Sequence, residues 1–167
     1  MNIKHVKACR KSPGQCSGCG KPIEIGQPYK LVASRFSAKK IKCNDCNFRP
    51  SELTTSKMGT VYDAQEATEK EVEEWTGEDI GNLSSALEDL AGTAREVAEE
   101  YQESISNMNN NPLTDEWQEK ADSLESWADD LEGVQFEEYG DQSDGTKKED
   151  WIEEQRQLAS DAIEECP

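Results

Sequence analysis

Apolar residues recur at helical spacing through most of the chain after residue 50. The clearest run steps by 4, 3, 4, 3 and 4 residues, the heptad-like spacing of one helix face, and consists of Leu83, Leu87, Leu90, Ala94, Val97 and Tyr101. Glycine and Asn-Pro breaks bound the runs. The pattern predicts helices over about 51–76, 79–109, 113–132 and 149–165, and thus an all-α bundle or coiled-coil hairpin over 58–167.

The first fifty residues lack this spacing. Short alternating runs at 23–25 and 29–32 are separated by Gly26-Gln27-Pro28, and a further extended run leads into residue 43. Such runs are typical of short strands joined by turns. A helix is expected to begin near Pro50, because proline suits a first helical position. We expect Gly133 and the stretch 140–145 to form a flexible acidic loop.

The charge of the chain is divided as sharply as its pattern. Residues 1–57 hold twelve basic and three acidic side chains, a formal charge of +9, and residues 58–167 hold six basic and thirty-three acidic ones, a formal charge of −27. Opposite fields in adjacent segments indicate two modules with different partners, or two modules that attract each other. The sequence therefore predicts a basic module over 1–57 and an acidic helical module over 58–167.

Four of the six cysteines form two C-x-x-C pairs, Cys16 with Cys19 and Cys43 with Cys46. Two such turns can direct four thiolates at one ion and complete a closed tetrahedral site. A module of about 57 residues also buries too little surface to fold easily without help. Disulfides and a redox C-x-x-C are the alternatives. We predict structural Zn²⁺ on these four cysteines, and treat Cys9 and His5 as incidental residues of a flexible arm.

The order of elements carries a resemblance to a known class. Knuckle, hairpin, second cysteine pair and helix follow one another, with the run Cys16-Ser17-Gly18-Cys19-Gly20-Lys21-Pro22-Ile23 followed by Gly26 and Tyr29. Residues 14–55 resemble a treble-clef zinc finger, and the layout is similar to that of small phage or prophage zinc-finger proteins. The resemblance implies a zinc-bound hairpin and helix, and it leaves nuclease, nucleic-acid-binding and protein-binding functions open.

The residues argue against an enzyme. His5 is the single histidine, and it lies outside the cysteine motif, whereas nucleases of the HNH type need a histidine beside the metal as general base. Four cysteines also leave no open position for an activated water. No nucleotide-binding loop, catalytic serine triad or distinctive carboxylate pair stands out in the sequence. We therefore expect a binding protein.

Basic side chains of the first module suggest nucleic acid as one partner. Dense lysine and arginine attract phosphate, and aromatic rings can stack on exposed bases. The candidates are Lys4, Lys7, Arg10, Lys11, Arg35, Lys39, Lys40 and Lys42. The alternatives are that the finger contacts a protein, or that these side chains only solvate a small core.

The acidic module is expected to contact a protein partner or to self-associate along the seam from Leu83 to Tyr101. The four tryptophans lie on or beside its apolar stripes and are expected in its core. The predicted function is a cytoplasmic, non-enzymatic zinc adaptor that makes no membrane contact. Two rivals stay open: an inhibitor whose acidic helices imitate DNA, and a structural assembly protein.

Overall fold

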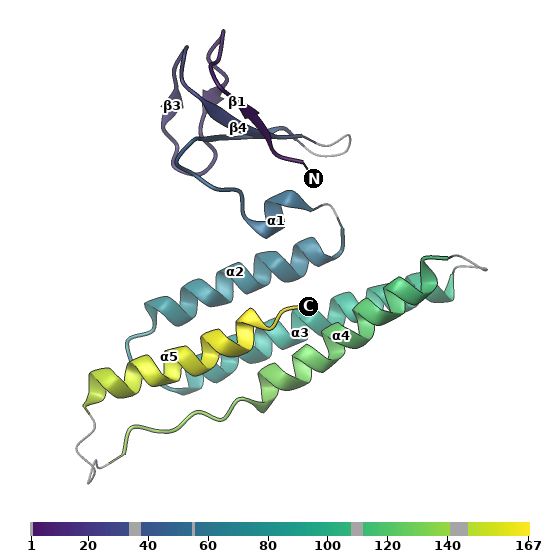
Figure 1. Ribbon diagram of the computed structural model, residues 1–167. Helices are drawn as coiled ribbons and strands as arrows, with labels where there is room; N and C mark the ends of the chain where they lie inside the picture. The colour runs from purple at the N-terminus through teal and green to yellow at the C-terminus, as the bar shows by residue number, and fades with distance from the viewer. Residues whose placement is uncertain (1, 34–37, 55, 108–111, 141–146) are drawn as a thin grey trace. The chain divides into compact units, whose positions relative to one another are not determined.

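The computed structural model describes residues 2–33, 38–54, 56–107, 112–140 and 147–167. The chain divides into two compact units, Met1–Gly59 and Thr60–Pro167. The first unit contains small antiparallel sheets and a short helix, and long helices make up the second (Figure 1). The change from short strands to long helices follows the change in hydrophobic spacing along the sequence.

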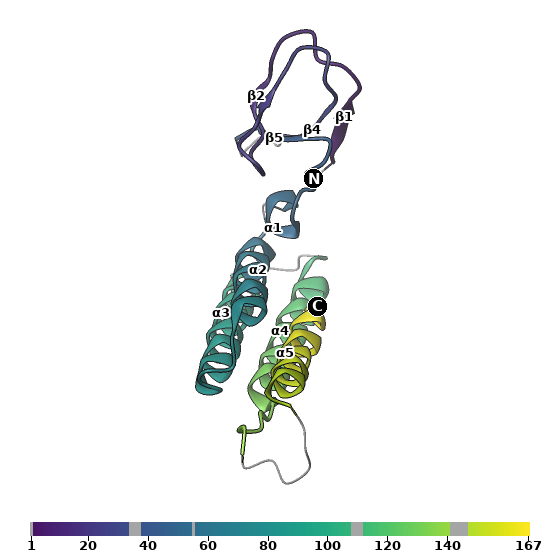
Figure 2. The same cartoon turned by 90° about the vertical axis from the view of Figure 1, so that its left-hand side faces the viewer.

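The first unit contains two small antiparallel sheets (Figure 2). One has the order β1-β4-β5, and the other is the hairpin of β2 and β3. The strand bounds are β1 Lys4–Val6, β2 Gly14–Gln15, β3 Pro22–Ile23, β4 Tyr29–Val32 and β5 Lys40–Cys43. Strand β1 pairs Lys4 with Leu31 and Val6 with Tyr29. The prediction of a flexible amino-terminal arm is therefore wrong for residues 4–6, which form a sheet edge.

A small core joins the two sheets. Cys9, Cys16 and Ile23 are buried together, with Tyr29 and Ile41 packed against them. The interpretation of Cys9 as incidental is also wrong, since its side chain is only 5 % exposed. Its thiol donates a hydrogen bond to the carbonyl oxygen of Glu24 at 2.8 Å. Cys9 thus behaves as a small buried hydrophobic residue whose weak donor is satisfied.

The helix expected over 51–76 is two helices, α1 (Pro50–Leu53) and α2 (Met58–Glu74). Thr54 ends α1 with extended backbone angles of φ −119° and ψ 155°. Its hydroxyl accepts a hydrogen bond from the backbone N–H of Ser56 at 3.1 Å. Local bonds of this kind offer the backbone an alternative to the helix, which explains the break that the apolar spacing did not reveal.

The second unit contains α2 from Thr60 onward, α3 (Gly81–Ser106), α4 (Thr114–Gly133) and α5 (Lys148–Glu164). Helix α3 has 26 residues and is about 39 Å long at 1.5 Å per residue. It lies antiparallel to α4 as a hairpin (Figure 1). None of the helices in the described part of the chain is long and apolar enough to cross a membrane.

The apolar seam of α3 packs within the chain. All six of its predicted members are buried, and the buried face of α4 contributes Ala121, Leu124, Trp127, Ala128 and Leu131. Helices α3 and α4 make by far the most extensive contact between elements of this unit. Because the seam is covered by α4, it is not available for the self-association that the sequence suggested along Leu83 to Tyr101.

Helices α2 and α5 complete the second unit. The indole N–H of Trp127 donates to the carbonyl of Ala162 at 2.9 Å, which fixes α4 to α5. The rings of Trp75 and Trp151 lie 5.5 Å apart between their centroids, which joins the end of α2 to α5. Three of the four tryptophans are buried and Trp117 is half-buried, which agrees with their predicted place in the core.

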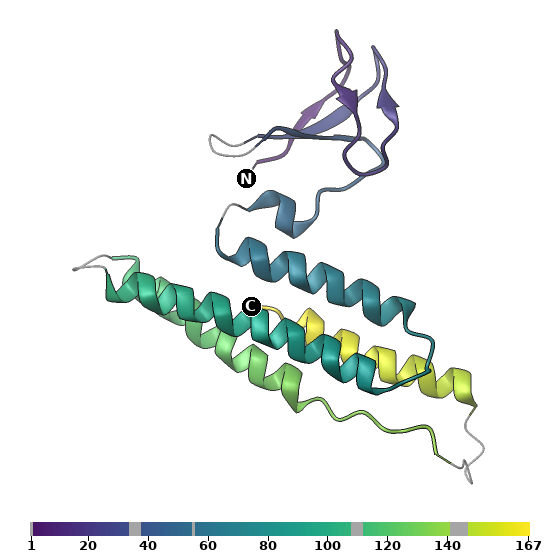
Figure 3. The same ribbon diagram turned by 180° about the vertical axis from the view of Figure 1, so that it is seen from behind.

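Residues 134–140 follow α4 without a helix (Figure 3). Val134 ends α4 with extended angles, φ −65° and ψ 124°. The backbone N–H of Glu137 donates to Gln155 Oε1 at 3.0 Å, and the carbonyl of Glu137 accepts from the indole N–H of Trp151 at 2.9 Å. Residues 134–140 thus form an extended strap tethered to α5. The loop expected at Gly133 is wrong, because Gly133 is the last residue of α4, and residues 141–145 of the other expected stretch lie outside the described residues.

Candidate metal centre

The fold of the first unit brings the two C-x-x-C pairs together. The sulfur atoms of Cys16, Cys19, Cys43 and Cys46 all lie within 4.8 Å of one another. The Sγ atoms of Cys19 and Cys43 are 3.8 Å apart. Zinc–sulfur bonds of about 2.3 Å in a tetrahedron place the sulfurs about 3.8 Å apart. The four thiols can therefore hold one metal ion, and their number and softness fit zinc.

The first pair sits on the turn of the β2–β3 hairpin. The backbone N–H of Cys16 donates to the carbonyl of Lys21 at 2.8 Å, and the N–H of Gly20 donates back to the carbonyl of Cys16 at 2.9 Å. Gly20 has a φ of +71°, a left-handed conformation that glycine adopts without strain. This closed turn points two side chains at one place, as a metal knuckle requires.

The second pair follows directly from a strand. Cys43 is the last residue of β5, and the N–H of Cys46 donates to the carbonyl of Cys43 at 3.3 Å. Two ammonium groups fix the next carbonyls, since Lys30 Nζ donates to the carbonyl of Cys46 at 3.2 Å and Lys42 Nζ to that of Asn47 at 2.8 Å. Hydrogen bonds from lysines of β4 and β5 therefore fix the backbone of the second turn.

Contacts between the two turns set their spacing. Ser17 donates to the carbonyl of Ile41 through its backbone N–H at 2.8 Å and its hydroxyl at 3.0 Å. A Cβ on Gly18 would lie 3.1 Å from Cys46 Cβ and 3.2 Å from Cys46 Sγ. Glycine at position 18 therefore allows the backbone of the first turn to approach the fourth sulfur.

The thiol environment is uneven. Burial raises the pKa of Cys16, but the backbone N–H groups of Cys19, Cys43 and Gly18 outweigh it and lower the pKa to about 6. Hydrogen bonds among the thiols raise the pKa of Cys46 to about 12, those with Cys43 and Cys16 most strongly. The cluster thus favours a first thiolate at Cys16 and retains a proton on Cys46, the proton that a bound cation would displace.

A buried ion pair lies next to the cluster. Lys42 Nζ is 2.5 Å from Glu52 Oε2, and the two side chains are only 5 % and 8 % exposed. Burial raises the pKa of Glu52, but the N–H of Arg49 and the ammonium of Lys42 outweigh this and lower it, so the carboxylate is charged at neutral pH. The pair ties β5 to the first turn of α1.

Lys42 must therefore be removed from the predicted nucleic-acid contacts. Its ammonium is bonded to Asn47 and Glu52 and lies 5.3 Å from the centre of the Phe48 ring. An ammonium enclosed in this way cannot reach a phosphate without breaking an ion pair of low exposure. The sequence contained no sign that this lysine differs from its neighbours.

The other predicted contacts are distributed over the unit. Lys4, Lys7, Arg10, Lys11 and Lys39 are exposed, Lys40 is half-buried, and Arg35 lies outside the described residues. Lys4 stands opposite Leu31 and Lys40 opposite Val32. Because successive residues of a strand point to opposite faces, Lys4 and Lys40 lie on different faces of the sheet. The three-stranded sheet does not gather them into one patch.

Sequence reasoning missed three supports of the cluster, namely Lys30, Glu52 and Cys9. For Glu52 a signal was present, because a glutamate at the third position of a helix that begins with proline can cap it. Glu52 does so, accepting the backbone N–H of Arg49 at 2.9 Å. The roles of Lys30 and Cys9 depend on strand register and on contacts between hairpins, which no local pattern reveals.

Comparisons of the chain with protein-family models, curated proteins and solved structures found no match. They therefore lend no support to the similarity to phage proteins. The metal centre is argued from the geometry of its four thiols, and the treble-clef resemblance from cysteine spacing and element order.

Proposed function

We propose that this chain is a non-enzymatic zinc-binding adaptor. Its first unit holds one structural Zn²⁺ on four cysteines and contacts nucleic acid or a nucleic-acid-bound protein, and its acidic helices contact a protein partner. The observation that carries the proposal is the convergence of four cysteine sulfurs within 4.8 Å. Such a set satisfies the four-coordinate preference of zinc without another ligand.

The structural role of the metal follows from the same ligand set. Catalytic zinc keeps a position open for water, and four thiolates leave none. His5 stands in β1 opposite Lys30 and is not among the clustered ligands. We infer a finger of the treble-clef type, because a knuckle hairpin, a further hairpin, a second cysteine pair and α1 follow in that order. The metal would supply folding free energy to a unit with a small core.

Two surfaces support the partner assignments. Lys7, Arg10 and Lys11 are exposed in the segment between β1 and β2, where phosphate can approach them. The helical unit bears most of the thirty-three acidic side chains on exposed positions, which favours a basic partner.

Metal analysis tests the first part of the proposal. Purified full-length protein is expected to contain one zinc per chain, and Cys43→Ser is expected to lose it together with the dispersed amide signals of β4 and β5. Cys166→Ser is the matched control, because Cys166 lies in the other unit and outside the cluster. Protein without stoichiometric zinc, or a Cys43→Ser variant with intact strands, would refute the assignment.

Salt dependence tests the second part. The logarithm of the affinity for a fluorescent oligonucleotide should fall linearly with the logarithm of salt concentration, with a slope of about −0.9 for each phosphate contact on duplex DNA. Replacing Lys7, Arg10 and Lys11 by glutamine should make this slope shallower by about 3. The control is Lys21→Gln, at an exposed position between β2 and β3, which should change the slope by at most about 1. A flat salt response would remove nucleic acid from the proposal and leave protein contact by the finger.

A further inference from the structure

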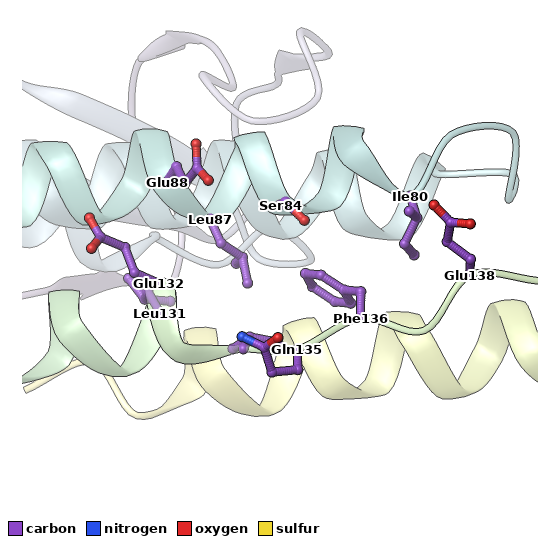
Figure 4. A pocket seen from close by; sticks show the side chains of 10 residues that line it. Ile80, Ser84, Leu87, Glu88, Leu131, Glu132, Gln135, Phe136 and Glu138 are labelled. Carbon is purple, nitrogen blue, oxygen red and sulfur yellow. The ribbon is translucent and has the colours of Figure 1, made fainter.

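The strap over 134–140 borders a hollow in the helical unit. Figure 4 shows Phe136 and Glu138 of the strap directed toward α3, with Ile80 and Leu87 facing them. The hollow has a volume of about 320 Å³ and is lined by α3, the end of α4 and the strap. This volume is at the lower end of the range of about 300–1,000 Å³ seen for ligand sites, so it suits one large side chain.

The floor of the hollow is apolar. Leu87 and Leu131 form its base and are each 1 % exposed. Ile80, Val134 and Phe136 form its walls and are half-buried. An apolar side chain inserted here would cover the exposed parts of Ile80, Val134 and Phe136, which is favourable in proportion to the area covered.

The rim of the hollow is acidic. Glu88, Glu132 and Glu138 line it and are exposed. Glu132 is paired with Arg95, whereas Glu88 and Glu138 have no ion-pair partner in the ranges that the structure describes. Two uncompensated carboxylates beside an apolar floor favour a ligand that carries positive charge on both sides of an apolar group.

The strap also offers free backbone groups. Glu137 directs its N–H and carbonyl toward Gln155 and Trp151 of α5. Successive residues of an extended chain direct these groups to opposite sides, so those of Phe136 and Glu138 face away from α5. There they make no hydrogen bond to any described residue. An unpaired extended edge is a template for a second extended chain.

We infer that this hollow binds an extended basic segment of a partner protein, with one apolar side chain on the Leu87–Leu131 floor and lysine or arginine beside Glu88 and Glu138. The strap supplies the backbone edge. The inference rests on the proposed function only in assigning a protein partner to the acidic helices. It needs neither zinc nor nucleic acid, so the two proposals can fail separately.

The test uses full-length protein and fluorescein-labelled peptides in which a central leucine, methionine, phenylalanine or tryptophan lies between lysine–arginine pairs. A peptide with central serine is the reference. Anisotropy is measured at about 0.3 M salt, where the Debye length of about 6 Å screens general attraction to an acidic surface. At least one apolar peptide is expected to bind about tenfold or more tightly than the serine peptide.

Matched variants locate the binding. Ser84 is half-buried and lines the hollow, so Ser84→Leu should fill it and weaken the best peptide about tenfold or more, whereas Ser85→Leu on the exposed side of α3 should not. Joint replacement of Glu88 and Glu138 by glutamine should weaken binding more than the same change at Glu96 and Glu153. Binding by none of the apolar peptides, equal binding of the serine peptide, or equal effects of the matched variants would overturn the inference. Loss of the zinc site in Cys43→Ser would leave peptide binding unchanged.

Discussion

The ion pair of Lys42 and Glu52 provides the sharpest test of how the first unit is held together. We consider Glu52→Gln, Lys42→Met and the double variant. Each single change leaves the other charge in a site where both side chains are less than a tenth exposed, at 5 % and 8 %. Glutamine keeps the size of glutamate and one oxygen for the N–H of Arg49, so the change removes mainly charge.

The expected loss of unfolding free energy follows from the burial of the ion pair. Removing one partner of a buried pair typically costs about 3–5 kcal/mol, because an uncompensated charge stays in the interior. At about 0.05–0.15 kcal/mol per residue, a unit of 59 residues has a total stability of about 3–9 kcal/mol. Either single variant should therefore approach the unfolding limit of this unit. The double variant should be more stable than the sum of the two losses implies, since no lone charge remains.

Amide hydrogen exchange in β4 and β5 measures the local free energy of opening without reporting on the helices. Protection should fall by at least a hundredfold in each single variant, and far less than the product of the two losses in the double variant. Lys21→Met and Glu24→Gln are controls at exposed positions. Single variants that match these controls, or strictly additive losses, would show that the pair does not stabilise the unit.

Two further predictions concern the helical unit. Gly77 has a φ of +77°, and a Cβ there would lie 2.5 Å from Ile152 Cγ1. Gly77→Ala should therefore lower the free energy of unfolding, measured by thermal unfolding, by about 2–4 kcal/mol. Gly92→Ala, exposed on α3 with no atom within 4 Å of the added Cβ, should raise it by up to about 1 kcal/mol, and equal effects would contradict the reasoning. Burial, and then the charge of Glu69, raises the pKa of Cys166 to about 11. Alkylation of this thiol by iodoacetamide at pH 8, followed by peptide mass spectrometry, should therefore be about a hundredfold slower in the folded protein than in protein unfolded by urea. Equal rates would show that the thiol is not buried as described.

Much of the chain could be predicted from local pattern. The spacing of the two C-x-x-C pairs anticipated the sulfur cluster, because a tight turn directs both of its side chains to one point. The buried face of α3 could also be predicted, since a strict heptad-like run has only one apolar face to bury. The geometry of each cysteine pair and the seam of α3 depend on residues close together in sequence.

Features set by one particular side-chain contact could not be predicted. The break between α1 and α2 depends on the Thr54 hydroxyl accepting the backbone N–H of Ser56, one of several local conformations open to such a segment. Lys42 looks like any surface lysine until the register of β5 turns it toward Glu52. The strap is held by Gln155 and Trp151 from a helix that follows it. In each case one hydrogen bond or ion pair decides the outcome, and for Lys42 and the strap it joins residues ten or more positions apart.

The charge of the helical unit yields a last prediction. Residues 60–167 carry six basic and thirty-three acidic side chains. Ion pairs in the described part of this unit include Lys70 with Glu74, Arg95 with Asp129 and Glu132, and Lys120 with Glu116, and six cations cannot neutralise thirty-three carboxylates. Like charges at neighbouring helix positions repel by a few tenths of a kcal/mol per pair, and the repulsion is stronger where the Debye length exceeds the spacing between helices.

Salt should therefore stabilise this unit. Tryptophan fluorescence reports it selectively, because all four tryptophans lie within it. The melting temperature should rise between about 0.01 M and 0.2 M sodium chloride, over which the Debye length shortens from about 30 Å to about 7 Å. Replacing sodium chloride by sucrose controls for effects other than screening. A melting temperature independent of salt would mean that the thirty-three carboxylates are far enough apart in the fold not to oppose it, and that burial along α3 and α4 meets no electrostatic resistance.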